Sequence, residues 1–182
     1  MNRFSIISKA AVATTALAFS VLAPAATTSE IDTRVGDALT RFYAAGPNHR
    51  ELARKASAVL VFPRVTKAGV GVGGEYGEGA LEVNGATVGY YKVTGASVGA
   101  TLGAARRSEV ILFMTDAARE KFVNSKGWTI GADAGVAVVK GAGADMDSQT
   151  LQHPVLAFVF GEKGLIGDVS LEGAKISKID QH

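Results

Sequence analysis

Hydrophobic residues divide the chain into a helical segment and a longer segment of strands. Over residues 30–45, apolar residues recur every three or four positions, and this spacing predicts an amphipathic helix. Gly46-Pro47 ends that helix, and residues 48–56 are expected to form a second, basic helix. From Ser57 onward, short apolar runs alternate with glycine, a pattern that is typical of strands.

Turn and breaker residues set the expected limits of these strands. Residues 58–62 predict a strand that closes at Pro63, because proline cannot donate a ladder hydrogen bond. Asn84-Gly85 lies between two apolar runs and predicts a two-residue hairpin turn, since both turn positions need positive φ. Further strands are expected at residues 81–83, 87–91, 96–102, 109–114, 129–139, 155–160, 165–171 and 174–179.

One helix is expected inside this strand-rich region. Residues 116–125 predict a helix capped by Thr115 or Asp116, with Phe122 and Val123 facing inward. Many short strands with few helices between them favour an α+β fold rather than a βαβ fold. We therefore expect a mainly antiparallel, strongly bent, glycine-rich sheet, either open or closed as a barrel, with N-terminal helices and one internal helix.

The first 25 residues have the three-part pattern of a secretory signal peptide: Arg3 and Lys9, an apolar run, and then Ala23-Pro24-Ala25. The run of about thirteen apolar residues is shorter than the roughly 20 that a spanning helix needs, which favours cleavage, near Ala25. The chain contains no cysteine, so it is not a lipoprotein. We expect a bacterial protein in the periplasm or cell envelope, or a secreted one.

The expected organisation is thus a signal peptide over residues 1–25, a helical segment over residues 26–56 and a glycine-rich β domain over residues 57–182. Arg3 and Lys9 are two of the 19 basic residues, so 17 basic and 17 acidic residues remain after processing. Nucleic-acid binding loses its usual electrostatic support. Basic residues nevertheless outnumber acidic ones over residues 30–67, and this segment could meet anionic head groups or be an ordinary solvated helix surface.

Two glycine motifs suggest chemistry that their surroundings disfavour. Residues 69–74 match the dinucleotide fingerprint G-x-G-x-x-G, and residues 95–99 match the nucleophile elbow G-x-S-x-G around Ser97. Each motif works only where a strand turns into a helix, and neither is followed by a helical pattern. The chain order Ser97, Asp133 or Asp145, and His153 keeps a serine esterase as a weak alternative.

The remaining polar residues give little support for catalysis or metal binding. The three histidines, His49, His153 and His182, have no metal-ligand spacing, and no calcium loop surrounds Asp145 and Asp147. Glu75, Glu78 and Glu82 could be paired carboxylates but fit a solvated rim better. We expect no enzyme activity, no metal and no cofactor.

Residues 57–178 resemble the SYLF domain family. The segments that carry the resemblance are residues 58–63, 67–79, 95–99 and 164–173, and they occur in family order. The resemblance implies binding to phospholipids, notably phosphoinositides in eukaryotic members, with an N-terminal amphipathic helix and basic residues taking part. It also implies that both glycine motifs belong to the framework of the family.

Carried over by position, the resemblance gives two groups of candidate residues. Candidates for membrane insertion are Ile31, Val35, Leu39 and Phe42. Candidates for head-group binding are Arg34, Arg41, Arg50, Arg54, Lys55, Arg64 and Lys67, and the sequence itself adds Arg106 and Arg107. The expected partner is anionic phospholipid at a membrane surface.

One further function stays open. The protein could instead be a structural envelope protein that binds a protein partner, unidentified by the sequence, through a flat glycine-rich sheet or an open sheet edge. The apolar stripe of residues 30–45 is equally open to two interpretations, since it could dock on the core of the domain or lie on a membrane.

Overall fold

The computed structural model describes residues 26–131, 135–139, 146, 148–161, 164–165, 171 and 173–180. Within them the elements follow the order α1 (Thr28–Ala45), α2 (His49–Lys55), β1 (Ala58–Val83), β2 (Ala86–Phe113), α3 (Asp116–Val123), β3 (Trp128–Thr129), β4 (Val136–Val139), a 3₁₀ turn (Thr150–Gln152), β5 (Val155–Gly161), β6 (Gly164–Leu165) and β7 (Lys175–Lys178). The predicted signal peptide lies outside the described residues. The predicted α+β fold, with N-terminal helices and one internal helix, is confirmed.

The dominant feature is an antiparallel ribbon made of β1 and β2, which are 26 and 28 residues long. Asn84 and Gly85 join the two strands with φ values of 53° and 77°, as the hairpin prediction requires. Pro63 does not close a strand, which corrects the prediction. It lies inside β1, where the register shifts between Phe62 and Val65, and such an irregularity tolerates a residue without an N–H.

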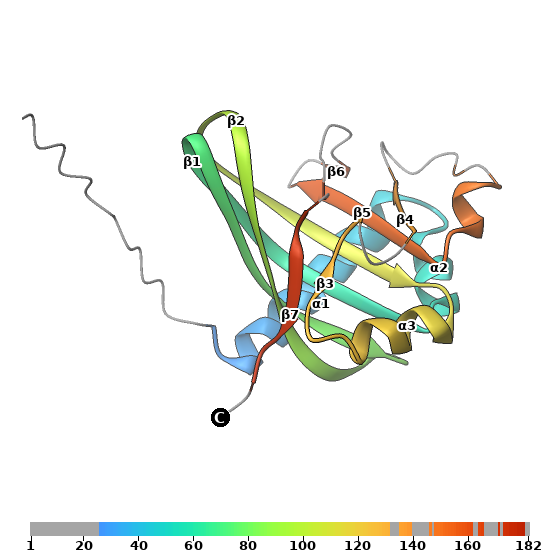
Figure 1. Cartoon of the computed structure of the whole chain (residues 1–182). Coiled ribbons are helices and arrows are strands. Elements are labelled where there is room, and N and C mark those ends of the chain that lie inside the picture. Colours follow the sequence, from blue (N-terminus) through green and yellow to red (C-terminus); the bar gives the residue numbers. More distant parts are fainter. Residues whose placement is uncertain are drawn as a thin grey trace, which may run out of the picture.

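The ribbon is folded back on itself near a second register shift, between Val70 and Val72 (Figure 1). We call residues 58–70 and 102–113 its proximal half, and residues 72–83 and 86–98 its distal half. The two halves touch closely at Gly79, where a Cβ atom would overlap the carbonyl oxygen of Val61. Two glycines of the distal half, Gly77 and Gly79, are therefore buried against the chain itself and form no flat surface open to a partner.

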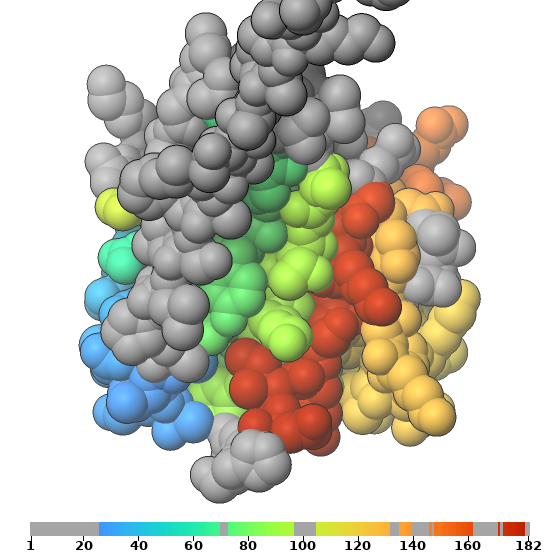
Figure 2. Space-filling view, turned by 60° about the vertical axis from the view of Figure 1, so that its left-hand side comes forward, coloured from blue at the N-terminus to red at the C-terminus, as the bar shows by residue number. Residues whose placement is uncertain are grey.

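Shorter strands extend this ribbon into a strongly curled half-barrel. β2 pairs with β7 in its distal half and with β5 in its proximal half, and β3 follows β7. Figure 2 shows β1, β2 and β7 side by side on one face of the molecule. Pairing among the described strands is antiparallel except between β4 and β5.

Two hydrophobic cores lie on opposite faces of the sheet, and alternate residues of β1 contribute to one or the other. On β1, Leu60 and Phe62 point into a core that α3 closes with Phe122, and β3 closes with Trp128. The neighbouring residues Val59 and Val61 point to the other face, which α1 and α2 cover. Val123 is 44% exposed, so the expectation that it faces inward is wrong.

Helix α1 lies across both halves of the ribbon. Near its N-terminus, Asp32 accepts hydrogen bonds from Thr87 and Tyr90 of the distal half. Near its C-terminus, Arg41 donates to Ser108 of the proximal half. Among the described residues, no helix is long and apolar enough to cross a bilayer.

Candidate anion-binding pocket

A pocket of about 230 Å³ opens where α1 meets the proximal half of the ribbon. Its volume is below the roughly 300–1,000 Å³ of pockets that take drug-sized ligands, so it suits a compact chemical group. The lining residues are Arg41, Pro63, Arg64, Arg106, Arg107, Ser108 and Gly161. Four of them are arginines, and no lining residue is acidic.

A bulge in β1 shapes this pocket. Between the pairs Phe62–Glu109 and Val65–Arg107, two residues of β1, Pro63 and Arg64, lie opposite the single residue Ser108 of β2. Such a bulge bends the strand and redirects its side chains. The Ser108 hydroxyl donates to the Pro63 carbonyl at 2.7 Å and accepts from Arg41 Nη2 at 3.2 Å. Ser108 thereby connects the bulge to helix α1.

Three of the four arginines carry positive charge that the described chain does not neutralise. Arg41, Arg64 and Arg106 are exposed, and within the described ranges none of them forms an ion pair. They come from three elements, α1, β1 and β2, so only the folded chain brings them to one pocket. Like charges held together in this way favour a bound anion.

Arg107, another of the predicted head-group residues, differs from these three because it has charged partners in the fold. Its Nε donates to Glu109 Oε1 at 2.7 Å and its Nη2 donates to Glu75 Oε2 at 2.8 Å. The three side chains are 9%, 0% and 11% exposed, so they form a buried ionic triad between the two halves of the ribbon. The positive charge of Arg107 is already paired.

Burial and ionic attraction shift the pKa values of the triad in opposite directions. It raises the pKa of Glu109, and the attraction of Arg107 offsets that rise only in part. For Arg107, burial acts to lower the pKa, but the combined attraction of Glu109 and Glu75 outweighs it and leaves the pKa raised. The second carboxylate oxygen of Glu109, Oε2, accepts no hydrogen bond from the described residues.

A second basic surface lies along α2. Arg50, Arg54 and Lys55 line a hollow of about 450 Å³ together with Pro47 and Glu51. The Arg50 guanidinium lies 4.5 Å from the centre of the Tyr43 ring, a cation–π contact. Lys55 pairs with Glu51 at 2.7 Å, and this ion pair lowers the pKa of the Glu51 carboxyl.

Residues 94–182 match the family model described as Ysc84, Las17-binding protein actin regulator, which is the SYLF family that the sequence resembles. We call residues 94–182 the SYLF segment. No curated protein matches the chain.

The SYLF segment supplies only part of the pocket. Arg106, Arg107, Ser108 and Gly161 lie within it, whereas Arg41 and the bulge residues Pro63 and Arg64 precede it. The pocket therefore forms only when α1 and β1 dock onto the SYLF segment.

The structure separates the predicted head-group residues into groups. Arg41, Arg64 and Arg106 meet at the pocket, and Arg50, Arg54 and Lys55 meet along α2. Arg34 lies 3.9 Å from Glu30 on its own helix, and Lys67 lines neither hollow. Arg41 therefore lies in a different hollow from Arg50, Arg54 and Lys55.

The four predicted insertion residues are buried in the protein itself. Ile31, Val35, Leu39 and Phe42 are 4%, 1%, 8% and 0% exposed and pack against the sheet. The Phe42 ring contacts Phe158 of β5 with 4.9 Å between ring centres. His49 of α2 is also buried, and its Nδ1 lies 2.8 Å from the Phe42 carbonyl oxygen.

Both glycine motifs lie at the fold of the ribbon and face each other. Gly73 pairs with Ser97, and Gly74 pairs with Ala96. β2 continues past Ser97 to Phe113, so no helix follows the serine and the elbow geometry that an esterase needs is absent. The dinucleotide motif likewise continues as strand β1. The candidate partners Asp133 and Asp145 lie outside the described residues.

Sequence reasoning missed the buried triad. Glu75 was expected at a solvated rim, but its side chain is 11% exposed and bound to Arg107. The only local signal was a glutamate, Glu109, inside the apolar run of residues 109–113. In the part of the chain that the structure describes, no group of three or more His, Asp or Glu residues could hold a metal ion.

Proposed function

We propose that this protein is exported and binds anionic phospholipid head groups at a membrane surface through the pocket of Arg41, Arg64 and Arg106. One observation carries the proposal: three arginines from three elements meet at a small pocket without an ion-pair partner in the described chain. Membership of the SYLF segment in a lipid-binding family supports it. The α2 surface of Arg50, Arg54 and Lys55 would add attraction to the same membrane.

The chemistry of the pocket suits phosphate. Arginine presents several N–H donors in a fixed plane and binds phosphate oxygens in pairs. The hydrogen bond from Arg41 to Ser108 holds one guanidinium in place before any ligand arrives, which lowers the ordering cost of binding. Binding through head groups also agrees with the burial of Ile31, Val35, Leu39 and Phe42, since no apolar side chain of α1 has to leave the core.

Vesicle flotation tests this function. The protein is mixed with neutral phosphatidylcholine vesicles, and with vesicles that also contain phosphatidylglycerol, at low and at high salt. We expect flotation with the anionic vesicles only, and less of it at high salt because exposed charges are screened. A cationic residue near an anionic surface contributes about 1 kcal/mol, so each of Arg41→Gln, Arg64→Gln and Arg106→Gln should weaken binding about fivefold.

Controls distinguish the pocket from net charge. The triple variant of Arg41, Arg64 and Arg106 should lose about a hundredfold in affinity. A charge-matched triple variant of Arg119, Lys126 and Lys175 should bind far more tightly, because these residues line neither basic hollow. Equal losses of affinity in the two triple variants would mean that binding depends on net charge alone and not on the pocket. Flotation of the pocket variant at the wild-type level would refute the proposal. Binding to an envelope protein without lipid would favour the alternative function.

A further inference from the structure

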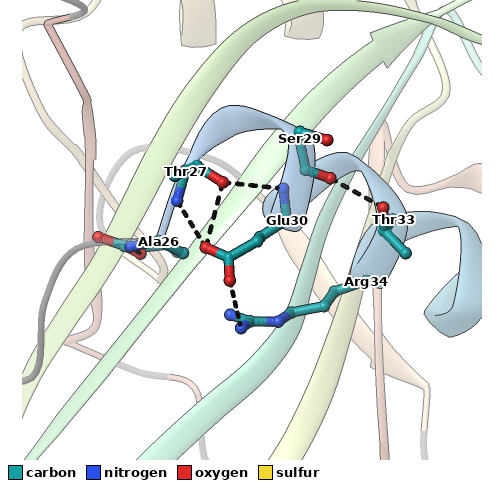
Figure 3. A network of polar contacts seen from close by, with 7 residues as sticks. Ala26, Thr27, Ser29, Glu30, Thr33 and Arg34 are labelled. Carbon is teal, nitrogen blue, oxygen red and sulfur yellow. Dashed lines mark hydrogen bonds and ion pairs between the residues drawn. The ribbon is translucent and has the colours of Figure 1, made fainter.

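The first residues of the described chain are held in place by polar contacts (Figure 3). Thr27 caps α1: its side-chain oxygen accepts from the Glu30 N–H at 3.3 Å, and its own N–H donates to the Glu30 carboxylate at 2.9 Å. This reciprocal capping box fixes the path of the chain immediately before the helix. Ala26 therefore has a defined position just outside α1.

The backbone nitrogen of Ala26 meets a carboxylate from a distant part of the chain. It donates to Glu78 Oε2 at 3.1 Å, and Glu78 belongs to the distal half of β1. The other oxygen, Oε1, accepts from the Tyr76 hydroxyl at 2.7 Å. Lys92 lies opposite Glu78 in the ladder, yet Glu78 forms no ion pair with any basic residue that the structure describes.

The Tyr76 hydroxyl, which donates to this carboxylate, is uncharged. Partial burial, and then the hydrogen bond to Glu78, raise the pKa of Tyr76 to about 12, so its hydroxyl remains protonated through the neutral range. Glu78 thus accepts hydrogen bonds from two neutral donors, and it has no cationic partner in the described chain.

We infer that Glu78 is the receptor for the α-ammonium group that removal of the signal peptide leaves on Ala26. The inference rests on the predicted cleavage after Ala25 and does not depend on lipid binding. Hydrolysis breaks the peptide bond between Ala25 and Ala26. Water supplies a hydroxyl to the Ala25 carbonyl carbon and a proton to the Ala26 nitrogen, which gains a further proton from solvent at neutral pH.

Processing would therefore change the contact in kind. Before cleavage, the Ala26 nitrogen is a neutral amide with one N–H. After cleavage it is a cation with three N–H donors, and the hydrogen bond to the Glu78 carboxylate becomes an ion pair between opposite charges. The mature N-terminus would be tied to the distal half of the ribbon, and the precursor would lack this ion pair.

The first test identifies the N-terminus of the exported protein. The full chain is produced in an exporting bacterium, and the first residue of the product is determined by intact-mass measurement and Edman degradation. We expect Ala26. A product that begins at any other residue overturns the inference.

The second test measures the pKa of the Ala26 amino group by NMR titration of that product. An α-amino group ordinarily titrates at about 7.7–8.0, and a neighbouring carboxylate should raise the value by about one unit. Glu78→Gln should return it to the ordinary range. Glu82→Gln is the matched control, since Glu82 follows on the same strand and has no contact with Ala26. Equal values in the wild type and Glu78→Gln overturn the inference.

Chemical acetylation of the wild-type amino group covers the case in which Glu78→Gln does not fold. A raised pKa in the folded state stabilises the protein below the ordinary value, and this stability is lost as the pH rises through the folded value. The melting temperature of the protein with a free amino group should therefore fall as the pH rises through the folded pKa. The acetylated protein should not show this fall. Identical pH profiles would overturn the inference. No vesicles are used, so failure here is distinct from failure of the lipid-binding proposal.

Discussion

Replacing Arg107 by methionine should destabilise the fold strongly, because it removes the cation from a buried triad. Glu109 and Glu75 would remain, with side chains 0% and 11% exposed, and neither could keep its ion pair at 2.7 or 2.8 Å. Removing one partner of a buried ion pair typically costs about 3–5 kcal/mol. For a chain of this size, that corresponds to a fall of about 6–20 °C in melting temperature.

Urea unfolding of wild type and variant, with the m-value as a check on the unfolded state, measures this cost. Arg106→Met is the matched control, since the neighbouring arginine is exposed and unpaired among the described residues; it should change stability by about 0.5 kcal/mol or less. The double variant of Arg107→Met with Glu109→Gln should recover part of the lost stability, because it also removes the Glu109 charge that would otherwise be buried without its partner. Equal effects of Arg107→Met and Arg106→Met on the free energy of unfolding would refute a stabilising role of the triad.

Two further predictions follow from the same ribbon. Burial raises the pKa of Glu109, so the folded protein binds the proton of this carboxyl more tightly than the unfolded chain does, and wild-type stability falls as the pH rises from 4.5 through the folded value. The stability of Glu109→Gln relative to the wild type should therefore increase between pH 4.5 and neutral pH, as measured by urea titrations. A stability difference that does not change with pH would contradict this. Gly79→Ala should cost about 1–3 kcal/mol, because its Cβ would overlap the Val61 carbonyl. Gly74→Ala, whose Cβ would lie 3.8 Å from the nearest oxygen, should be near neutral, and equal melting temperatures would argue against the close contact of the two halves.

Local patterns were enough to predict the helices, the hairpin turn and the fold class. The short, continuous apolar runs of residues 58–62 and 155–160 predicted strands correctly, because a strand that is buried on both faces needs no polar residues between its apolar ones. The same pattern could not show that β1 runs on through Pro63, since the bulge opposite Ser108 depends on a strand 45 residues away.

The candidate site was predictable only in its residue types. Arg41, Arg64 and Arg106 stood out as basic residues, but their meeting at one pocket depends on the docking of α1 and on the β1 bulge. The triad could not be predicted from the sequence for the same reason, since Glu75 and Arg107 are 32 residues apart and meet only because the ribbon folds back. Contacts of this kind arise from tertiary packing and leave no periodic signal.

The position of α1 decides between two ways of meeting a membrane. Leu39 is buried against the sheet, while Arg41 follows it on the exposed side and reaches Ser108. Undocking α1 to insert its apolar stripe would therefore remove Arg41 from the pocket, so the two modes exclude each other.

Leu39→Ala separates these modes. The substitution should cost about 2–5 kcal/mol of stability and loosen the helix. If head groups bind at the assembled pocket, Leu39→Ala should weaken vesicle binding at a temperature where the variant remains folded by circular dichroism. If α1 inserts instead, a loosened helix should bind at least as well as the wild type. Thr40→Ala, an exposed change on the same helix, is the control and should leave binding unchanged. Stronger binding by Leu39→Ala would favour insertion and contradict a docked α1 on the membrane.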